Sequence, residues 1–276
     1  MHKTLYVTDL DGTLLHSDKT ISPKTVLILN EFIRQGNLFT YATARSIISS
    51  SKLTSEISFQ IPVITLNGTV LADHSTKQEI EVESFSTEQL TQIKILLNSF
   101  NIPGFITAYL EKEDHTYYGY KWYLENLKNP GFSAYLSEHK DDKRLCAVMK
   151  EEELYQGNVS YFTFIGEKEE LDPIYASIKN CPIINCNYEQ NKYGPEYWLE
   201  IFPRNASKAK AIEKLKCRYA CDKVIVFGDS FNDIPMFQIA DESYAVENAV
   251  KQLKEIASSI IGKNDDDGVA NWLKTL

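Results

Sequence analysis

The sequence contains no long apolar run, and none of its 276 residues lies in a stretch approaching the roughly 20 consecutive apolar residues that a membrane-spanning helix needs. An acidic residue, Asp9, interrupts the N-terminal segment before an apolar signal region develops. We therefore expect neither a membrane span nor a secretory signal.

Cysteine and basic residues are also scarce. Five cysteines in a chain of this length do not form a disulfide scaffold, and one must stay unpaired within a monomer, which favours a reducing, cytoplasmic setting. The 29 basic against 38 acidic residues give a net charge of −9, which disfavours a general nucleic-acid binder. The 43% hydrophobic and 24% charged content is that of an ordinary globular protein, and the length favours about two domains.

Strand-like and helix-like segments alternate at both ends of the chain. Leu5–Thr8, Leu38–Ala42 and Pro62–Leu66 are β-prone runs, and Ser22-Pro23 is typical of a helix start between the first two. The pattern returns with the apolar run Lys223–Phe227. This alternation predicts a doubly wound parallel sheet with helices on both faces, and polar residues that follow its strands lie where such sheets bind ligands.

The middle of the chain has a different pattern, with denser strands and more aromatic residues. We interpret this region as an α+β domain inserted into the α/β core. Residues 84–203 then form the insertion, and residues 1–83 and 204–276 form the core.

Two acidic clusters follow apolar strands. Asp9 and Asp11 flank one residue directly after the first strand, where their carboxylates repel unless a cation or proton lies between them. Taken alone, this pair is more typical of a solvated turn. The second cluster, Gly228-Asp229 and Asn232-Asp233, adds oxygen ligands of the kind that Mg²⁺ prefers.

A hydroxyl and a cation lie between these clusters in the sequence. Thr43 follows a predicted strand, and Lys208 lies at a predicted helix start. A nucleophilic acid, a second acid, a metal, a hydroxyl and a cation together are the components of phosphoryl transfer through an acyl-phosphate.

The ordered motifs resemble those of the haloacid dehalogenase-like hydrolases. The matching segments are D-L-D-G-T at Asp9–Thr13, A-T-A-R at Ala42–Arg45, S-K at Ser207-Lys208 and G-D-S-F-N-D at Gly228–Asp233. L-N-G at 66–68, E-N-A at 247–249 and D-G-V-A at 267–270 are similar to the Cof-type branch of sugar-phosphate phosphatases. The resemblance implies a Rossmann-like core with an inserted, substrate-selecting cap.

The resemblance also implies catalytic and metal-binding roles. Asp9 would be the nucleophile, and Asp11 the general acid and later the base, while Thr43 and Lys208 would hold the phosphoryl oxygens. The implied cofactor is Mg²⁺, with Asp9, Asp11 (through its backbone carbonyl) and Asp229 as ligands. Asn232 and Asp233 would organise the metal shell and the ammonium of Lys208. The residues expected on the substrate side are Gly12, Ala44, Arg45, Asn67 and Asn232.

Some of these positions have more than one interpretation. The family usually has glycine where Ala44 and Ala209 stand, so we expect altered fit around the phosphate. Arg45 is compatible with phosphate binding or with a structural ion pair. Asn67 is compatible with substrate binding or with a turn role in Asn-Gly.

The implied activity is Mg²⁺-dependent hydrolysis of a small phosphomonoester, such as a sugar phosphate, through an aspartyl-phosphate. Two alternatives stay open: a phosphotransferase or phosphomutase on the same scaffold, and a catalytically silent regulator that binds phosphometabolites. We expect a small-molecule substrate, no nucleic-acid or membrane partner, and a monomer or small homo-oligomer.

Overall fold

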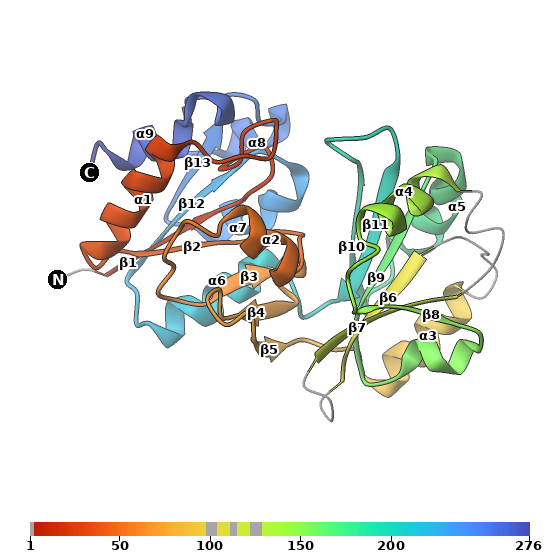
Figure 1. Cartoon of the computed structure of the whole chain (residues 1–276). Coiled ribbons are helices and arrows are strands. Elements are labelled where there is room, and N and C mark those ends of the chain that lie inside the picture. The colour runs from red at the N-terminus through yellow and green to blue at the C-terminus, as the bar shows by residue number, and fades with distance from the viewer. Residues whose placement is uncertain (1–2, 98–103, 111–114, 122–128) are drawn as a thin grey trace. The chain divides into compact units, whose positions relative to one another are not determined.

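The computed structural model describes residues 3–97, 104–110, 115–121 and 129–276 (Figure 1). The chain divides into two compact units, the first made of residues 1–81 and 206–276 and the second of residues 82–205. These divisions lie two residues from the expected boundaries at 83/84 and 203/204. Among the described residues, no helix is long and apolar enough to cross a membrane.

The first unit is built on a parallel sheet with the strand order β14-β13-β12-β1-β2. The chain moves outward from β1 to β2 in its first part and from β12 to β14 in its last part. The winding direction therefore reverses between the neighbours β1 and β12, where open α/β sheets bind their ligands. The strands are β1 (Thr4–Thr8), β2 (Leu38–Tyr41), β12 (Lys223–Gly228), β13 (Glu242–Val246) and β14 (Ser259–Ile261).

A smaller sheet continues the first one. It has the order β3-β4-β5, and a parallel bridge between Ala42 and Ile64 joins it to the chain after β2. A tight 3-10 turn, η1, connects β3 and β4. These elements are β3 (Val63–Thr65), η1 (Leu66–Gly68), β4 (Val70–Ala72) and β5 (Glu79–Val82).

Local sequence signals begin the helices of this unit. Ser22 caps α1 by accepting a hydrogen bond from the backbone amide of Thr25, and Ser207 caps α6 in the same way from Lys210. Helices α1 and α9 pack together, as do α6 and α7, and Figure 1 shows helices on both sides of the sheet. The helices are α1 (Pro23–Arg34), α2 (Ile47–Leu53), α6 (Lys208–Arg218), η4 (Phe231–Asp233), α7 (Ile234–Ile239), α8 (Lys251–Ile256), η5 (Asn264–Asp266) and α9 (Gly268–Leu273).

The second unit has a mostly antiparallel sheet with the order β10-β11-β9-β6-β7-β8, in which only β7 and β8 pair in parallel among the described strands. Its larger core cluster includes Ile93 of α3 and Leu171 of α5, and a smaller one includes Phe132 of α4. The strands are β6 (Gly104–Leu110), β7 (His115–Lys121), β8 (Leu145–Val148), β9 (Asn158–Gly166), β10 (Ile184–Gln190) and β11 (Tyr197–Pro203). The helices are α3 (Thr87–Leu97), α4 (Pro130–Glu138), η3 (Glu151–Tyr155) and α5 (Lys168–Ile178). This α+β unit agrees with the predicted insertion in type.

Candidate active site

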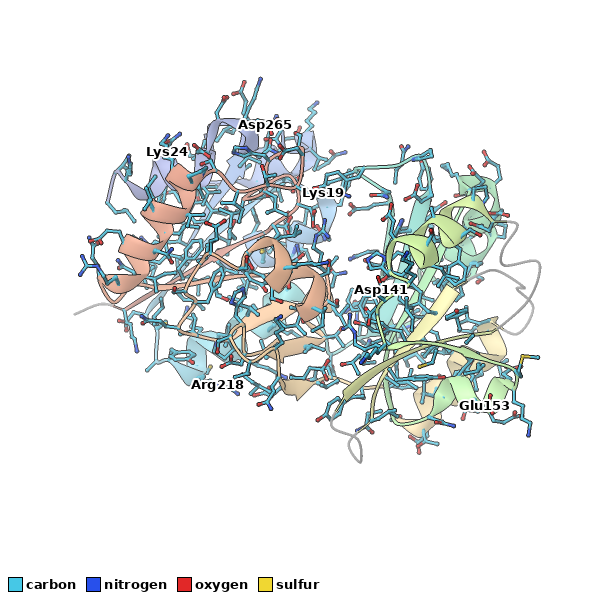
Figure 2. All side chains as sticks on the ribbon, in the orientation of Figure 1. Lys19, Lys24, Asp141, Glu153, Arg218 and Asp265 are labelled. Atoms are coloured by element: carbon cyan, nitrogen blue, oxygen red, sulfur yellow. The ribbon has the colours of Figure 1, made fainter. Side chains whose placement is uncertain are left out.

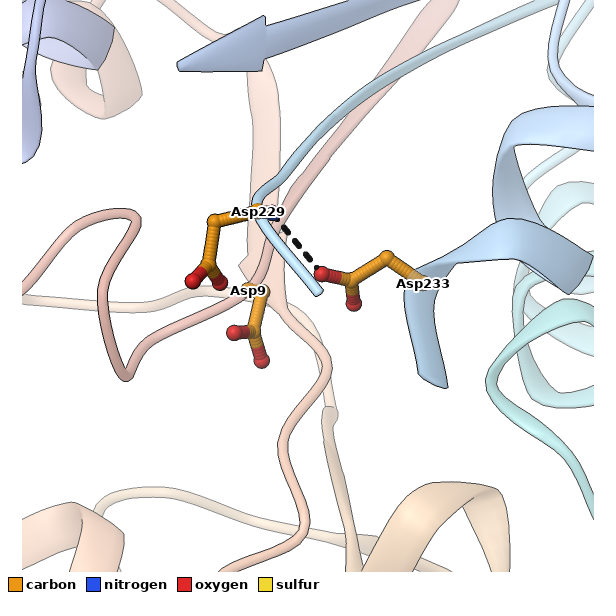
Figure 3. Close-up of side chains that lie close together, drawn as sticks. All are labelled: Asp9, Asp229 and Asp233. Carbon is orange, nitrogen blue, oxygen red and sulfur yellow. Dashed lines mark hydrogen bonds between the residues drawn. The ribbon is translucent and has the colours of Figure 1, made fainter. Parts of the chain in front are cut away.

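Two buried aspartates lie side by side where β1 and β12 end. Thr8 pairs with Phe227 across these strands, and the Asp9 amide donates a hydrogen bond to the Phe227 carbonyl over 2.9 Å. Asp9 and Asp229 therefore leave the sheet at the same edge, as Figure 3 shows. Together with Asp233 they form a buried trio in which one carboxylate oxygen of each residue lies within 4.8 Å of the others.

Lys208 neutralises part of this negative charge. It is the first residue of α6, and its side chain is only 1% exposed. Its Nζ lies 2.8 Å from Oδ1 of Asp9 and 2.7 Å from Oδ1 of Asp233. Burial alone lowers the pKa of this ammonium, but the charges of Asp233 and Asp9 outweigh burial and raise the pKa above its usual value. Lys208 is thus a permanent cation inside the site at neutral pH.

Asp233 organises the loop that carries Asp229. One carboxylate oxygen, Oδ2, accepts hydrogen bonds from the backbone amides of Asp229 at 2.9 Å and Ser230 at 3.0 Å. The other oxygen accepts from Lys208. Because both oxygens hold the loop and the lysine, Asp233 is better suited to positioning than to binding a metal. Figure 3 draws one of these bonds as a dashed line.

The carboxylates of Asp9 and Asp229 are suited to bind a divalent cation. Asp9 and Asp229 offer buried, ionisable oxygens, which are the ligands that Mg²⁺ prefers. Thr13 orients Asp229, since its hydroxyl donates to Oδ1 of Asp229 over 3.0 Å. A metal held here would offset the repulsion between the clustered acids.

Asp11 has a different partner from Asp9. Its carboxylate forms a bidentate ion pair with Arg45, in which Nε lies 2.7 Å from Oδ2 and Nη2 lies 2.6 Å from Oδ1. The Arg45 and Asp11 side chains are 21% and 20% exposed, so the pair is partly shielded from solvent. Of the two interpretations of Arg45, the structure contains the ion pair. The Asp11 carboxylate does not belong to the buried acidic trio, whose third member is Asp233. The metal contact expected of Asp11 was through its backbone carbonyl and does not require this carboxylate.

Thr43 and Asn67 lie on neighbouring loop segments. Thr43 is fully buried, and its Oγ1 accepts a hydrogen bond from the Arg45 amide over 3.2 Å. The backbone amide of Asn67 donates a hydrogen bond to the Thr43 carbonyl over 2.9 Å. Ala44, between Thr43 and Arg45, is partly buried and contributes no polar side-chain group. The A-T-A-R segment is therefore joined directly to the L-N-G turn.

Asn67 and Asn232 form a side-chain pair. Nδ2 of Asn232 lies 3.4 Å from Oδ1 of Asn67. Oδ1 of Asn232 is buried and has no hydrogen-bond partner among the residues that the structure describes. A buried unpaired acceptor is unfavourable, so this oxygen is available to a donor on a bound molecule. The pair brings together two residues that were expected on the substrate side.

The L-N-G turn has an unusual backbone. Leu66, Asn67 and Gly68 have φ values of 46°, 53° and 91°, all in the left-handed region that is unfavourable for residues with a Cβ. Gly68 faces the start of α6, where a Cβ at this position would lie 2.1 Å from the Ser207 carbonyl oxygen and 2.7 Å from the Lys208 amide nitrogen. The turn therefore packs directly against the residue that supplies the buried cation.

We expect Gly68→Ala to destabilise the protein and to lower activity. The left-handed φ alone costs about 1 kcal/mol, and the clash with α6 adds roughly 1–3 kcal/mol and displaces Lys208. Gly36→Ala is the matched control, because Gly36 has a φ of 90° but, apart from its chain neighbours, no heavy atom within 4 Å of the added Cβ. Urea unfolding and phosphate release measure both effects. Equal losses in the two variants would contradict the close packing at Gly68.

Two contacts of the site were not predicted from the sequence. The hydrogen bond from Thr13 to Asp229 joins segments 216 residues apart. Asn248 donates to the Gly12 carbonyl over 2.7 Å. The E-N-A motif contains Asn248, but the motif by itself does not indicate which residue it contacts.

The sheet topology and the acids at its reversal point are those of a hydrolase built on a doubly wound α/β core. The sequence matches the family described as haloacid dehalogenase-like hydrolase over residues 6–273. The chain therefore belongs to the haloacid dehalogenase-like hydrolases, and the resemblance seen in its motifs is confirmed.

Curated relatives support a phosphoric monoester hydrolase. A 5-amino-6-(5-phospho-D-ribitylamino)uracil phosphatase of Bacillus subtilis is 27% identical, with 98% of this chain and 96% of the relative covered. A pyridoxal phosphate phosphatase of Escherichia coli is 24% identical, with 96% and 95% covered. Both matches span the core and the inserted unit alike.

Solved structures confirm the predicted fold class. A haloacid dehalogenase-like hydrolase of Bacteroides thetaiotaomicron has a TM-score of 0.78 at 21% identity, with 100% of this chain and 99% of that chain covered. A Thermotoga maritima protein has a TM-score of 0.75 at 25% identity, with 100% and 98% covered. The Rossmann-like core with an inserted second unit is thus the fold of these proteins too.

Proposed function

We propose that this protein is a metal-dependent phosphatase that hydrolyses small phosphomonoesters through an aspartyl-phosphate on Asp9. The observation that carries the proposal is the buried group of Asp9, Asp229 and Lys208 at the reversal point of the sheet. A carboxylate held beside both a cation and a candidate metal site can approach an anionic phosphate, which it would otherwise repel.

Asp9 supplies the nucleophile in this proposal. One carboxylate oxygen attacks phosphorus, the bond from phosphorus to the leaving oxygen breaks, and Asp11 protonates the departing alcohol. Water then attacks the phosphorus of the aspartyl-phosphate and gives its proton to Asp11. The products are inorganic phosphate and the original Asp9 carboxylate, so atoms and charges balance over the cycle.

The neighbouring groups stabilise the phosphoryl oxygens. Lys208 and Thr43 hold them, and a bound Mg²⁺ would supply further positive charge to the same oxygens. Arg45 holds Asp11 until substrate enters, and the unpaired Asn232 oxygen receives a donor from the substrate. The other residues assigned to substrate binding are Gly12, Ala44 and Asn67. Asp233 supports Lys208 and the Asp229 loop.

The substrate is proposed by class. Relatives are named phosphatases of pyridoxal phosphate, of a phosphoribitylamino-uracil and of HMP-PP. We propose a small soluble metabolite of this kind or a sugar phosphate as the substrate, with residues 82–205 acting as the substrate-selecting cap.

Phosphate release with and without metal tests this function. We expect the purified protein to release phosphate from an aryl phosphate and from members of a panel of hexose phosphates, pyridoxal phosphate, flavin mononucleotide and nucleotides. EDTA should abolish release, since the carboxylates would then lack their divalent counter-ion, and Mg²⁺ should restore it.

The same panel separates the alternatives. Isomerised sugar phosphate without free phosphate would indicate a phosphomutase, and transfer to an added alcohol would indicate a phosphotransferase. Tight binding without turnover across the panel would indicate a regulator and would contradict the proposal.

A further inference from the structure

The segment between β13 and α8 touches both acid-bearing loops of the site. The amide of Val250 donates to the carbonyl of Asp229 over 2.8 Å. Two residues earlier, Nδ2 of Asn248 donates to the carbonyl of Gly12 over 2.7 Å. One short stretch of chain therefore links the backbone after Asp11 to the backbone of Asp229.

Asn248 is itself held in place from its other side. Its Oδ1 accepts a hydrogen bond from the backbone amide of Asn264 over 3.1 Å. The Asn264 side chain is buried and donates to the Leu15 carbonyl over 3.0 Å. The Asp11–Leu15 turn is thus bound at two carbonyls by two asparagines that are hydrogen-bonded to each other.

The turn gains from this support because its backbone is adaptable. Gly12 has a φ of 79°, and glycine has a broad choice of backbone conformations. The Gly12 carbonyl belongs to the peptide next to the one that carries the Asp11 carbonyl. The hydrogen bond from Asn248 therefore restrains the peptide group adjacent to the one that carries the Asp11 carbonyl.

The same loop is tied further along the chain to the C-terminal segment. Oδ1 of Asp267 accepts hydrogen bonds from the hydroxyls of Ser22 and Thr25, and the Asp265 carboxylate accepts from both the backbone amide and the hydroxyl of Ser17. Figure 2 labels Asp265 and Lys19, which lies in the loop between this turn and α1; both belong to the first unit. These contacts restrain residues beyond the turn, whereas the Asn248 bond acts on the residue next to Asp11.

We propose that Asn248 is a positioning residue that fixes the Asp11 turn relative to Asp229. The assignment rests on the proposed function of Asp11 as proton donor and acceptor. Asn248 acts through the Gly12 peptide and takes no part in bond making. Supporting residues of this kind typically change activity or metal affinity by about 10–100-fold when they are replaced.

The test variant is Asn248→Asp. It keeps the shape and the oxygen that accepts from Asn264, but it replaces the donor to Gly12 by a carboxylate oxygen that repels the carbonyl. We expect kcat for an aryl phosphate to fall about 10–100-fold with a smaller change in KM. Lowering the pH from about 8 to about 5 should raise the ratio of variant to wild-type activity, because a protonated carboxyl can donate to Gly12.

Amide hydrogen exchange supplies a readout that does not depend on activity. The amides of Thr13, Leu14 and Leu15 donate within the turn to the Leu10 carbonyl. We expect these amides to exchange faster in Asn248→Asp than in the wild type, while the amides of β12 are unchanged.

Asn271→Asp is the matched control. Asn271 also donates from Nδ2 to a backbone carbonyl, that of Asp266 at 2.7 Å, and its Oδ1 accepts from the Lys24 ammonium, so both of these side-chain bonds lie outside the Asp11–Leu15 turn. Wild-type kcat and exchange in this control, beside the losses in Asn248→Asp, would support the assignment.

Two outcomes would overturn the assignment. One is an equal effect in both variants, and the other is a loss of kcat without faster exchange at residues 13–15. If wild-type protein released no phosphate, the proposed function would fail, and the exchange comparison would still decide whether Asn248 holds the turn.

Discussion

Asp9→Asn is expected to lower phosphate release by at least about 10³-fold while the fold remains intact. The amide of asparagine is a poor nucleophile toward phosphorus. Its oxygen still accepts a hydrogen bond from Lys208, which lies 2.8 Å from Oδ1 of Asp9 in the native site. Steady-state release from an aryl phosphate measures activity, and urea unfolding measures stability.

Asp222→Asn controls for the loss of one carboxylate. Asp222 is exposed and accepts a hydrogen bond from the Lys3 amide, at the end of β1 opposite to Asp9. This variant should keep wild-type activity. Metal-dependent turnover in Asp9→Asn at the wild-type rate would contradict the assignment of the nucleophile.

Lys208→Met is expected to abolish activity and also to destabilise the protein. The substitution leaves the buried carboxylates of Asp9 and Asp233 without the ammonium that bridges them. Breaking a buried ion pair in this way typically costs about 3–5 kcal/mol. Urea unfolding and phosphate release measure the two losses.

A second substitution separates stability from catalysis. Lys208→Met combined with Asp233→Asn removes one of the two stranded charges, and the asparagine side chain keeps an oxygen for the amides of Asp229 and Ser230. We expect this double variant to regain part of the stability but none of the activity. A single variant as stable as the wild type would show that Lys208 does not bridge the acids.

The stability that Lys208 contributes has a defined pH dependence. Its pKa in the folded protein is raised, so the contribution is complete below the unfolded value of about 10.4 and is lost as pH rises through the higher folded pKa. The difference in unfolding free energy between wild type and Lys208→Met should therefore be constant from about pH 6 to pH 9.

The sequence was sufficient to predict that Asp9 and Asp229 meet, but it did not predict that the Asp11 carboxylate pairs with Arg45. Asp9 and Asp229 each follow an apolar strand, and neighbouring parallel strands end at the same edge of a sheet. Once the two strands are recognised as neighbours in a parallel sheet, the proximity of Asp9 and Asp229 follows. The position of Lys208 at the start of α6 was also predictable, because Ser207 is a typical helix cap.

The partners of Arg45 and Asn67 were not predictable to the same degree. Arginine binds phosphate and carboxylate with the same geometry, so the sequence left both possibilities for Arg45 open. The left-handed turn is held by tertiary hydrogen bonds from the backbone amide of Leu66 to the Arg45 carbonyl and from that of Asn67 to the Thr43 carbonyl, which no local pattern reveals. Contacts such as Asn248 with Gly12 join residues 236 positions apart and are equally hidden.

Trapping the covalent intermediate shows directly whether Asp9 is the nucleophile. Enzyme mixed with Mg²⁺ and an aryl phosphate is quenched in acid within one turnover, digested and examined by mass spectrometry. We expect a phosphoryl group on Asp9 in the wild type and none in Asp9→Asn. A phosphoryl group on another residue, or rapid turnover with no phosphorylated peptide, would contradict it.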